Sequence, residues 1–132
     1  MLSGGCFCGA IRYETSDQVF QRTICHCPSC RGVTGTAHVP WLSVKASDFR
    51  IVTGTPTQFH SSPTVVRTFC GTCGTQLTYH NSALNGEMDL TICSLDDAAQ
   101  YAPADHTFAH YRLEWDRGDD GLPVYQRTRD GT

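Results

Sequence analysis

The chain has 132 residues, 17 % of them charged, and a formal net charge of −3. This length suits one domain with a single modest core. Acids and bases are interspersed, so the sequence shows no electrostatic footprint for nucleic acid or an anionic membrane, and neither is an expected partner. No basic and apolar leader precedes the first motif and no apolar run is long enough to span a bilayer, which predicts a cytoplasmic protein.

Short runs of β-forming residues recur along the chain, with turn-forming residues between them. The clearest runs are 10–14, 49–52, 65–69 and 76–79, and the breakers are 32–35, 54–56, 61–63 and 85–86. No stretch keeps a helical period for three turns, and only 95–101, starting at Asp96 or Asp97, suits a short helix. We therefore expect a mostly β domain over residues 1–126 and a loose tail over residues 127–132.

Seven of the eight cysteines fall in three tight clusters. They are Cys6 and Cys8, then Cys25, Cys27 and Cys30, then Cys70 and Cys73. Such a density indicates disulfides in a secreted protein, but in a reducing compartment it indicates metal. Local pairs favour zinc because each pair fixes two of four tetrahedral ligands. Disulfides or plain buried cysteines are the alternative interpretation.

The segment 70–74, Cys-Gly-Thr-Cys-Gly, has the form of a zinc knuckle. Its glycines permit a tight turn in which backbone N–H groups face the thiolates. Residues two apart in a strand face the same side, so Cys6 and Cys8 can reach one ion. The same argument applies to Cys25 and Cys27, and the turn that follows brings the third cysteine of that cluster to the same place.

The number of sulfurs in each cluster separates two kinds of zinc site. Two pairs supply four thiolates and close a tetrahedral structural site, whereas the triplet supplies three and leaves one position open, as catalytic sites do. Spacing alone also permits other partitions, such as the knuckle with Cys25 and Cys27. The triplet would also suit a second structural site completed by a distant side chain.

The candidates for a distant ligand are Cys93 and the histidines. A lone cysteine in a strand is more typical of a small packed side chain than of a ligand. His26 lies between two ligands and so points to the opposite face of the strand, which makes it a poor ligand for their metal. For the remaining histidines a surface position or a satisfied core position is expected; they are His38, His60, His80, His106 and His110.

Arg31 directly follows the triplet. Three thiolates on Zn²⁺ leave a net charge of −1, which an adjacent guanidinium can offset while it holds an incoming carboxylate or thiolate. A solvated arginine beside a turn is the alternative. The chain shows no Ser-His-Asp order, no phosphate-cradling glycine loop and no H-E-x-x-H run, so hydrolase and nucleotide-binding functions lack support.

Three blocks of sequence in this order resemble the glutathione-dependent formaldehyde-activating enzyme family, which includes centromere-protein-V-like proteins. The blocks are Gly-Cys-Phe-Cys-Gly-Ala-Ile-Arg-Tyr at 5–13, Cys-His-Cys-Pro-Ser-Cys-Arg at 25–31 and Thr-Phe-Cys-Gly-Thr-Cys-Gly-Thr at 68–75. Further matches at 94–97, at Trp115 and at 120–125 extend the likeness over nearly the whole chain.

The resemblance implies a zinc-stabilised β-tent of antiparallel sheets with two Zn²⁺ ions per chain. It assigns a structural zinc to Cys6, Cys8, Cys70 and Cys73, and a catalytic zinc to Cys25, Cys27 and Cys30. The implied activity is of the carbon-sulfur lyase type, joining or parting a thiol such as glutathione and formaldehyde. The expected partners are therefore a small-molecule thiol and an aldehyde, and the expected catalytic group is the triplet with Arg31.

Two other functions fit the same cysteines. A two-zinc module could bind a small thiol or a protein partner without turnover, and clustered thiolates near Arg31 could form a redox switch if the metal leaves. An exchangeable fourth ligand at the triplet favours the enzyme, whereas a fourth ligand from the protein favours the module. His26 and His38 are the local candidates for a general acid or base.

Overall fold

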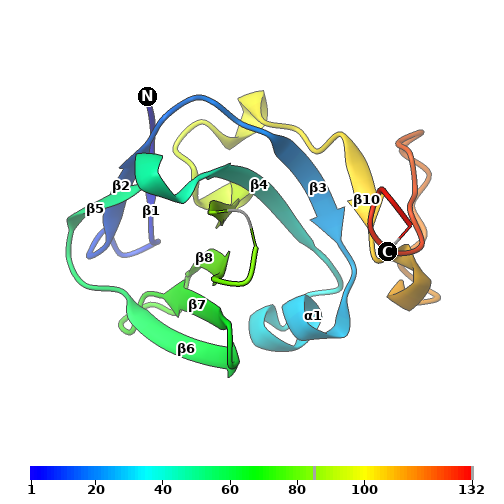
Figure 1. Cartoon of the computed structure of the whole chain (residues 1–132), viewed down its shortest axis with the longest axis horizontal. Coiled ribbons are helices and arrows are strands. Elements are labelled where there is room, and N and C mark those ends of the chain that lie inside the picture. The colour runs from blue at the N-terminus through cyan, green and yellow to red at the C-terminus, as the bar shows by residue number, and fades with distance from the viewer. Residues whose placement is uncertain (85, 132) are drawn as a thin grey trace.

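A computed structural model describes residues 1–84 and 86–131 of the chain. In that part, ten strands form two sheets and one α-helix is present, which confirms the prediction of a mostly β, single-domain fold. The three-stranded sheet lies at one end of the molecule and the C-terminal segment lies against β10 at the other (Figure 1). None of the described helices is long and apolar enough to cross a membrane.

The smaller sheet has the order β1-β2-β5 and is antiparallel throughout. Its strands are β1 Leu2–Gly5, β2 Arg12–Thr15 and β5 Arg50–Thr53. Residues alternate between the two faces of a strand, and in β2 the inward positions are Tyr13 and Thr15. The buried Tyr13 hydroxyl lies 2.6 Å from Ser94 Oγ, which ties this sheet to the turn that follows β9.

The larger sheet has the order β10-β3-β4-β9-β8-β7-β6. Its strands are β3 Gln21–Cys25, β4 Val39–Lys45, β6 Thr57–Ser62, β7 Val65–Phe69, β8 Gln76–Asn81, β9 Glu87–Thr91 and β10 Asp105–Thr107. All pairs are antiparallel except β10 with β3, which is parallel. The expected antiparallel arrangement therefore holds in all but this edge pairing.

Two clusters of buried side chains fill the interior. The main cluster packs apolar residues such as Leu42, Leu77 and Leu90 with Cys6 and Cys70. The smaller cluster consists of Cys25, Cys30, Val39 and Trp41. The knuckle cysteines thus belong to the main core between the sheets, whereas the triplet belongs to a separate core beside β4. Burying the main cluster is the chief stabilising contribution, since each fully buried aliphatic side chain is worth about 1.5–3 kcal/mol.

The α-helix, α1 Pro28–Thr34, was not predicted from the sequence. Its seven residues make two turns, too few for a hydrophobic period to be recognised. Local signals nevertheless mark both ends: the Cys27 side chain caps the first turn, Pro28 occupies an N-terminal position, and Gly35 closes the last turn at φ 69°. Glycine adopts that left-handed conformation without the strain that a Cβ would add.

The short helix expected over 95–101 is confined to a 3₁₀ turn, η3 Ala98–Gln100. Asp97 precedes it but its side chain makes no capping hydrogen bond. The other 3₁₀ turns are η1 Ala46–Asp48, η2 Ile92–Ser94 and η4 Ala109–Tyr111. Of the predicted breakers, Asn85 lies outside the described residues.

The C-terminal segment contacts the larger sheet at two described points. The Arg127 carbonyl accepts a hydrogen bond of 2.9 Å from the Phe108 N–H. The Arg129 guanidinium pairs with the Asp105 carboxylate and donates to Gln21 Oε1 at 2.5 Å. Thr132 lies outside the described residues, so looseness of the tail as a whole stays a prediction.

Candidate functional site

Four cysteines from two turns meet at the seam between the sheets. Cys6 and Cys8 come from the β1–β2 turn, and Cys70 and Cys73 from the β7–β8 turn. Their sulfurs lie within 4.8 Å of one another, with Cys6 Sγ 3.6 Å from Cys8 Sγ and Cys8 Sγ 3.8 Å from Cys70 Sγ. A zinc tetrahedron with sulfur bonds of about 2.3 Å has sulfur–sulfur edges of about 3.8 Å. The four sulfurs therefore have the spacing that a structural zinc requires.

Backbone N–H groups point at these sulfurs. The Ile11 N–H donates to Cys6 Sγ at 3.2 Å, and the Thr72 N–H donates to Cys70 Sγ at 3.4 Å. Gly74, at φ 84°, completes the knuckle with an N–H bond of 2.8 Å to the Cys70 carbonyl. Such donors stabilise thiolates as metal ligands. The turn therefore has the thiolate-facing donors that the sequence predicted for a zinc knuckle.

All eight cysteines are free thiols, so no disulfide accounts for their clustering. Cys93 is exposed, lies in η2 and joins neither group of sulfurs. Its position on a 3₁₀ turn differs from the strand position expected from the sequence, because β9 ends at Thr91. Cys93 is therefore neither a packed core residue nor a ligand in this arrangement.

The second group of sulfurs lies where β3 joins α1. Cys25 ends the strand, Cys27 caps the helix and Cys30 lies in its first turn. Their three sulfurs lie within 4.8 Å of one another, and no other Cys, His, Asp or Glu of the described residues joins the group. The sulfurs are thus grouped as the family resemblance implies, with the knuckle apart from the triplet. That the two groups hold zinc stays a prediction.

Hydrogen bonding within the triplet favours a thiolate. Hydrogen bonds from the Cys25 and Cys30 thiols lower the pKa of the Cys27 thiol, despite its burial. The Cys30 N–H adds a further donor, 3.3 Å from Cys27 Sγ. The same interactions raise the pKa of Cys25. Cys27 is therefore the thiol of this group that loses its proton most readily, and a bound cation would draw off the other protons.

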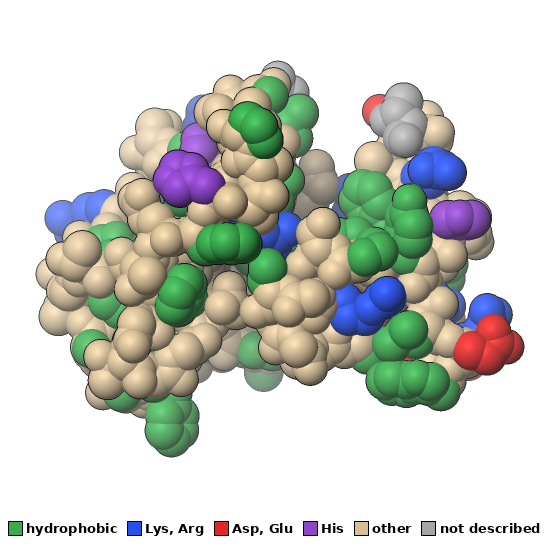
Figure 2. Space-filling view, turned by 90° about the horizontal axis from the view of Figure 1, so that it is seen from below, with side chains coloured by type: hydrophobic (Ala, Val, Ile, Leu, Met, Phe, Trp, Pro, Cys, Tyr) green, Lys and Arg blue, Asp and Glu red, His purple; other side chains and the backbone are tan. Residues whose placement is uncertain are grey.

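A cavity of about 860 Å³ opens beside the triplet. Its walls include Trp41, Tyr79 and Phe108, and its rim includes Leu84 and the segment 128–130. Figure 2 shows it as the notch between two lobes of the face seen from below. Its volume lies in the range of small-molecule sites, which are mainly apolar with a few polar groups. The triplet thus faces a space that can admit a peptide-sized thiol.

Arg67 is the arginine that touches the triplet. It lies on β7 and its side chain is only 4 % exposed. Its guanidinium nitrogens lie 3.8 and 3.9 Å from Cys30 Sγ, its Nε donates to Ser61 Oγ at 3.2 Å, and its Cζ stacks 4.8 Å from the Tyr79 ring centre. Because a buried charge needs a partner of opposite charge, Arg67 supports a negatively charged triplet. Sequence reasoning missed it, although Val65 and Arg67 share the inward face of one alternating strand.

Arg31 has a different position. Its guanidinium donates a hydrogen bond of 2.9 Å to the Tyr111 carbonyl, and Tyr111 lines the rim of the cavity. Arg67, rather than Arg31, thus supplies the described guanidinium contact to a triplet sulfur. A role for Arg31 in holding a carboxylate at the rim stays a prediction.

Asp89 is a second polar group that sequence reasoning missed. It lies on β9 between Ser43 of β4 and Tyr79 of β8, and lines the same cavity. Burial raises the pKa of its carboxyl to about 6, and Glu87 acts in the same direction. The Ser43 hydroxyl donates to it at 2.5 Å, and His80 and Arg67 also favour the charged form. A carboxyl with this pKa can accept and return a proton near neutral pH.

His26 points away from the triplet, as predicted. Its ring is 1 % exposed and lines a separate cavity of about 210 Å³ with His38 and His106. Burial lowers the pKa of His26 to about 4, and the nearby Arg112 adds to this. His26 and His38 therefore do not line the cavity that the triplet faces, which leaves Asp89 as the better candidate for acid-base chemistry there.

Comparisons with known proteins identify one matching family model and a similar crystal structure. The family model described as glutathione-dependent formaldehyde-activating enzyme matches residues 1–111. The crystal structure of a Rhodobacter sphaeroides protein is similar, with a TM-score of 0.63 and 21 % identity over 92 % of this chain and 98 % of that one. The search among curated proteins found no match. At this identity the structural likeness supports the fold alone.

The two sulfur groups should differ in what they do for stability. Cys70→Ser removes a predicted zinc ligand that is 62 residues from Cys8 and lies in the main core, so it should lower the free energy of unfolding by several kcal/mol and leave the chain largely unfolded. Cys27→Ser should fold and lose only one zinc. Thermal unfolding and elemental analysis of both variants, with Cys93→Ser as control, test this. Equal stability of Cys70→Ser and Cys27→Ser would contradict it.

Asp89 should impose a pH dependence on stability. Its folded-state pKa of about 6 exceeds the ordinary 3.8, so the folded protein binds the proton more tightly and loses stability as pH rises from about 4 through 6. Asp89→Asn removes this loss. Its free energy of unfolding should therefore exceed that of the parent by up to about 3 kcal/mol at pH 7, and should not exceed it at pH 4. Urea unfolding of both proteins across this range, with the zinc content of each measured at every pH, gives the difference; a pH-independent difference would be inconsistent with a buried titrating carboxyl.

Proposed function

This chain belongs to the glutathione-dependent formaldehyde-activating enzyme family, and on that basis we propose that it is a zinc-dependent enzyme of the carbon-sulfur lyase type. It joins or parts a small thiol, such as glutathione, and formaldehyde. The observation that carries the proposal is the three-sulfur group with no fourth ligand among the described residues, at the wall of a cavity of about 860 Å³. A zinc ion with an open position supplies Lewis acidity and lowers the pKa of a thiol or water placed there.

The reaction needs one proton to move. In the forward direction a bond forms between the thiol sulfur and the aldehyde carbon, the carbonyl π bond breaks, and the thiol proton ends on the new hydroxyl. Asp89 is the proposed carrier, because its carboxyl lines the same cavity and its pKa of about 6 lets it accept and release the proton. The reverse reaction uses the same group in the opposite order.

Arg67 is proposed to keep the thiolate in place. Cys25, Cys27 and Cys30 as thiolates would hold Zn²⁺ with a net charge of −1, and a substrate thiolate at the open position would make it −2. The buried guanidinium beside Cys30 offsets part of that charge. The attraction is strong because the dielectric constant is low in the protein interior. Stacking on Tyr79 fixes the direction of the guanidinium.

The cavity and the free cysteines agree with a small thiol as partner and with a reducing compartment. A cavity of this size suits a tripeptide thiol, and Arg31, whose guanidinium donates to the carbonyl of the cavity-lining Tyr111, is proposed to hold one of its carboxylates. Free cysteines agree with a reducing environment, so we propose that the protein acts in the cytoplasm. The alternative is a two-zinc module that binds the thiol, or a protein partner, without turnover.

The proposal predicts catalysis of thiol-aldehyde equilibration. The zinc-loaded protein should accelerate exchange between glutathione and its hydroxymethyl adduct, measured by exchange spectroscopy against a protein-free blank. Cys27→Ser should abolish the acceleration while the fold is kept, and Cys93→Ser should not change it. Because the uncatalysed reaction is easy, several protein concentrations are compared. A fully zinc-loaded protein that matches the blank with every thiol tested would favour the binding module.

The same assay separates the two arginines. Arg67→Lys keeps the charge but loses the planar contact with Cys30 and Tyr79, so it should slow exchange for all thiols, by about tenfold or more. Arg31→Ala should weaken the binding of glutathione more than the binding of a neutral thiol such as mercaptoethanol, because only glutathione offers a carboxylate. If Arg31→Ala slowed both thiols equally and Arg67→Lys slowed neither, the assignment of these roles would be wrong.

A further inference from the structure

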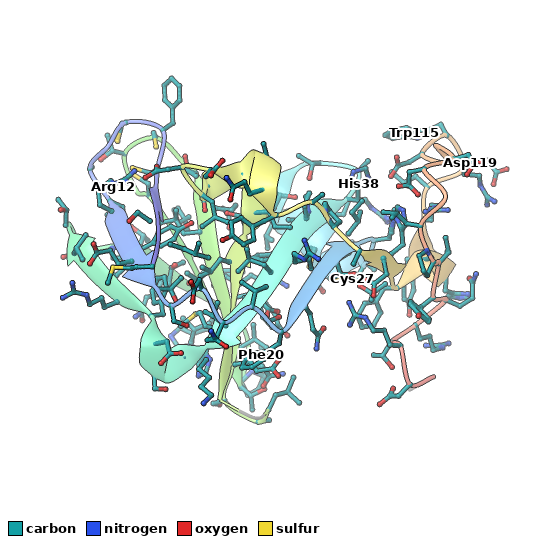
Figure 3. The ribbon with its side chains drawn as sticks, turned by 90° about the horizontal axis from the view of Figure 1, so that it is seen from above. Arg12, Phe20, Cys27, His38, Trp115 and Asp119 are labelled. Atoms are coloured by element: carbon teal, nitrogen blue, oxygen red, sulfur yellow. The ribbon has the colours of Figure 1, made fainter. Side chains whose placement is uncertain are left out.

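A third group of metal-ligating side chains lies on the opposite side of the β3–α1 connection from the triplet. It consists of His26, His38 and Asp116, whose ligand atoms lie within 4.8 Å of one another. They line the cavity of about 210 Å³. Figure 3 shows His38 between the strands of the larger sheet and the loop that carries Trp115 and Asp119. Neither the family resemblance nor the proposed function makes use of this group.

The protonation of His26 follows from its neighbours. The Arg112 guanidinium, which can only donate, lies 3.0 Å from His106 Nδ1, so that nitrogen is an acceptor. His26 Nε2 lies 2.9 Å from the same nitrogen and must therefore carry a proton and donate it. In a neutral His26 the other nitrogen, Nδ1, then carries no proton and can only accept a hydrogen bond or bind a cation.

That nitrogen has no hydrogen-bond partner among the described residues. His26 Nδ1 is buried, in a ring that is 1 % exposed, and it faces Asp116 Oδ2 at 3.7 Å. Asp116 Oδ2 is hydrogen-bonded to His38 Nδ1 at 2.7 Å, so the unpaired acceptor of this group is His26 Nδ1. A buried unpaired acceptor costs about 1–3 kcal/mol, and a cation bound to it would remove that cost.

We propose that His26, His38 and Asp116 bind a divalent first-row transition metal ion, independently of the two cysteine groups. Imidazole and carboxylate together suit Zn²⁺ or Fe²⁺ rather than Mg²⁺ or Ca²⁺, which prefer oxygen ligands alone. Tetrahedral bonds of about 2.0–2.1 Å place ligand atoms about 3.3 Å apart. The separations of 2.7 Å from His38 Nδ1 to Asp116 Oδ2, and 3.7 Å from His26 Nδ1 to that oxygen, lie on either side of this value.

The surroundings favour the ion over a simple histidine-aspartate pair. His26 donates its remaining N–H to His106, whose Nε2 lies 2.8 Å from Asp120 Oδ2. This chain of support behind a ligand histidine is typical of metal sites, where it fixes the tautomer and orients the ring. A pair between His38 and Asp116 alone would explain neither the bare nitrogen of His26 nor the support behind it.

The charges around the cavity also favour a cation. Three aspartates line it, at positions 116, 119 and 120, against a single arginine at 112. The Arg112 side chain is directed to His106 rather than to Asp116, so it does not occupy the place of the ion. His38 and Asp116 are 36 % and 18 % exposed, which leaves the ion a route from solvent.

The test uses Co²⁺ as a spectroscopic probe. Protein loaded with two zinc ions is titrated with Co²⁺, followed by calorimetry and by the visible spectrum. We expect one further equivalent to bind, with weak d–d bands and no thiolate-to-cobalt charge transfer, because nitrogen and oxygen hold it. His38→Ala and the isosteric Asp116→Asn should each weaken binding at least tenfold. His60→Ala, a change at an exposed histidine of β6, should leave it unchanged.

The outcomes separate this site from the cysteine groups. Both cavity variants should keep two zinc ions and the parental circular dichroism, so lost Co²⁺ binding cannot be ascribed to unfolding. Charge-transfer bands would show that Co²⁺ had replaced zinc at a cysteine group, and would overturn the assignment. So would the absence of an additional equivalent, or equal binding by all the variants. Thiol exchange by the parent is measured separately, and its failure would leave this result intact.

Discussion

Four sulfur atoms at the seam of the two sheets form the contact on which the rest of the structure depends. They come from the β1–β2 and β7–β8 turns, which are far apart in the sequence, and two of the cysteines, Cys6 and Cys70, are packed in the main core. Their separation matches the edge of a zinc tetrahedron, and N–H groups already face them. A metal ion bound here would join the small sheet to the β7–β8 hairpin, which carries Arg67 on β7.

The chemistry of the second sulfur group depends on that framework. Cys25, Cys27 and Cys30 are gathered by a strand end and a two-turn helix that are adjacent in the sequence. Arg67 and Asp89, by contrast, reach the cavity from β7 and β9 and are placed by the sheet. The triplet would be a plain metal-binding loop without them. With them it has a buried countercharge and a carboxyl that titrates near neutral pH.

The sequence predicted the parts of this arrangement that are local. The run 65–69 coincides with β7, and the knuckle and the triplet were identified from their spacing. The helix α1 was missed because two turns carry no recognisable period, although its capping residue Cys27 and the terminal Gly35 were visible. Which pair completes the knuckle site could not follow from spacing, and came from the family resemblance.

The parts that the sequence could not predict are those made by long-range packing. Arg67 is 37 residues from Cys30, and an arginine in a strand looks like a solvated residue until its neighbours are known. His38 and Asp116, 78 residues apart, showed no ligand-like spacing for the same reason. Adjacency in sequence predicted a role for Arg31, whereas the fold brings Arg67 to the sulfurs.

The measurement that tests the central claim most directly is zinc X-ray absorption on protein holding two zinc ions, with and without glutathione. Four sulfurs at one site and three at the other give an average of about 3.5 sulfur ligands per zinc, which should rise to about 4 when the thiol takes the open position. The Cys27→Ser protein, with one zinc, should show four sulfurs and no change. An average of four before glutathione, unaltered by it, would mean that the triplet site is closed and would contradict the account.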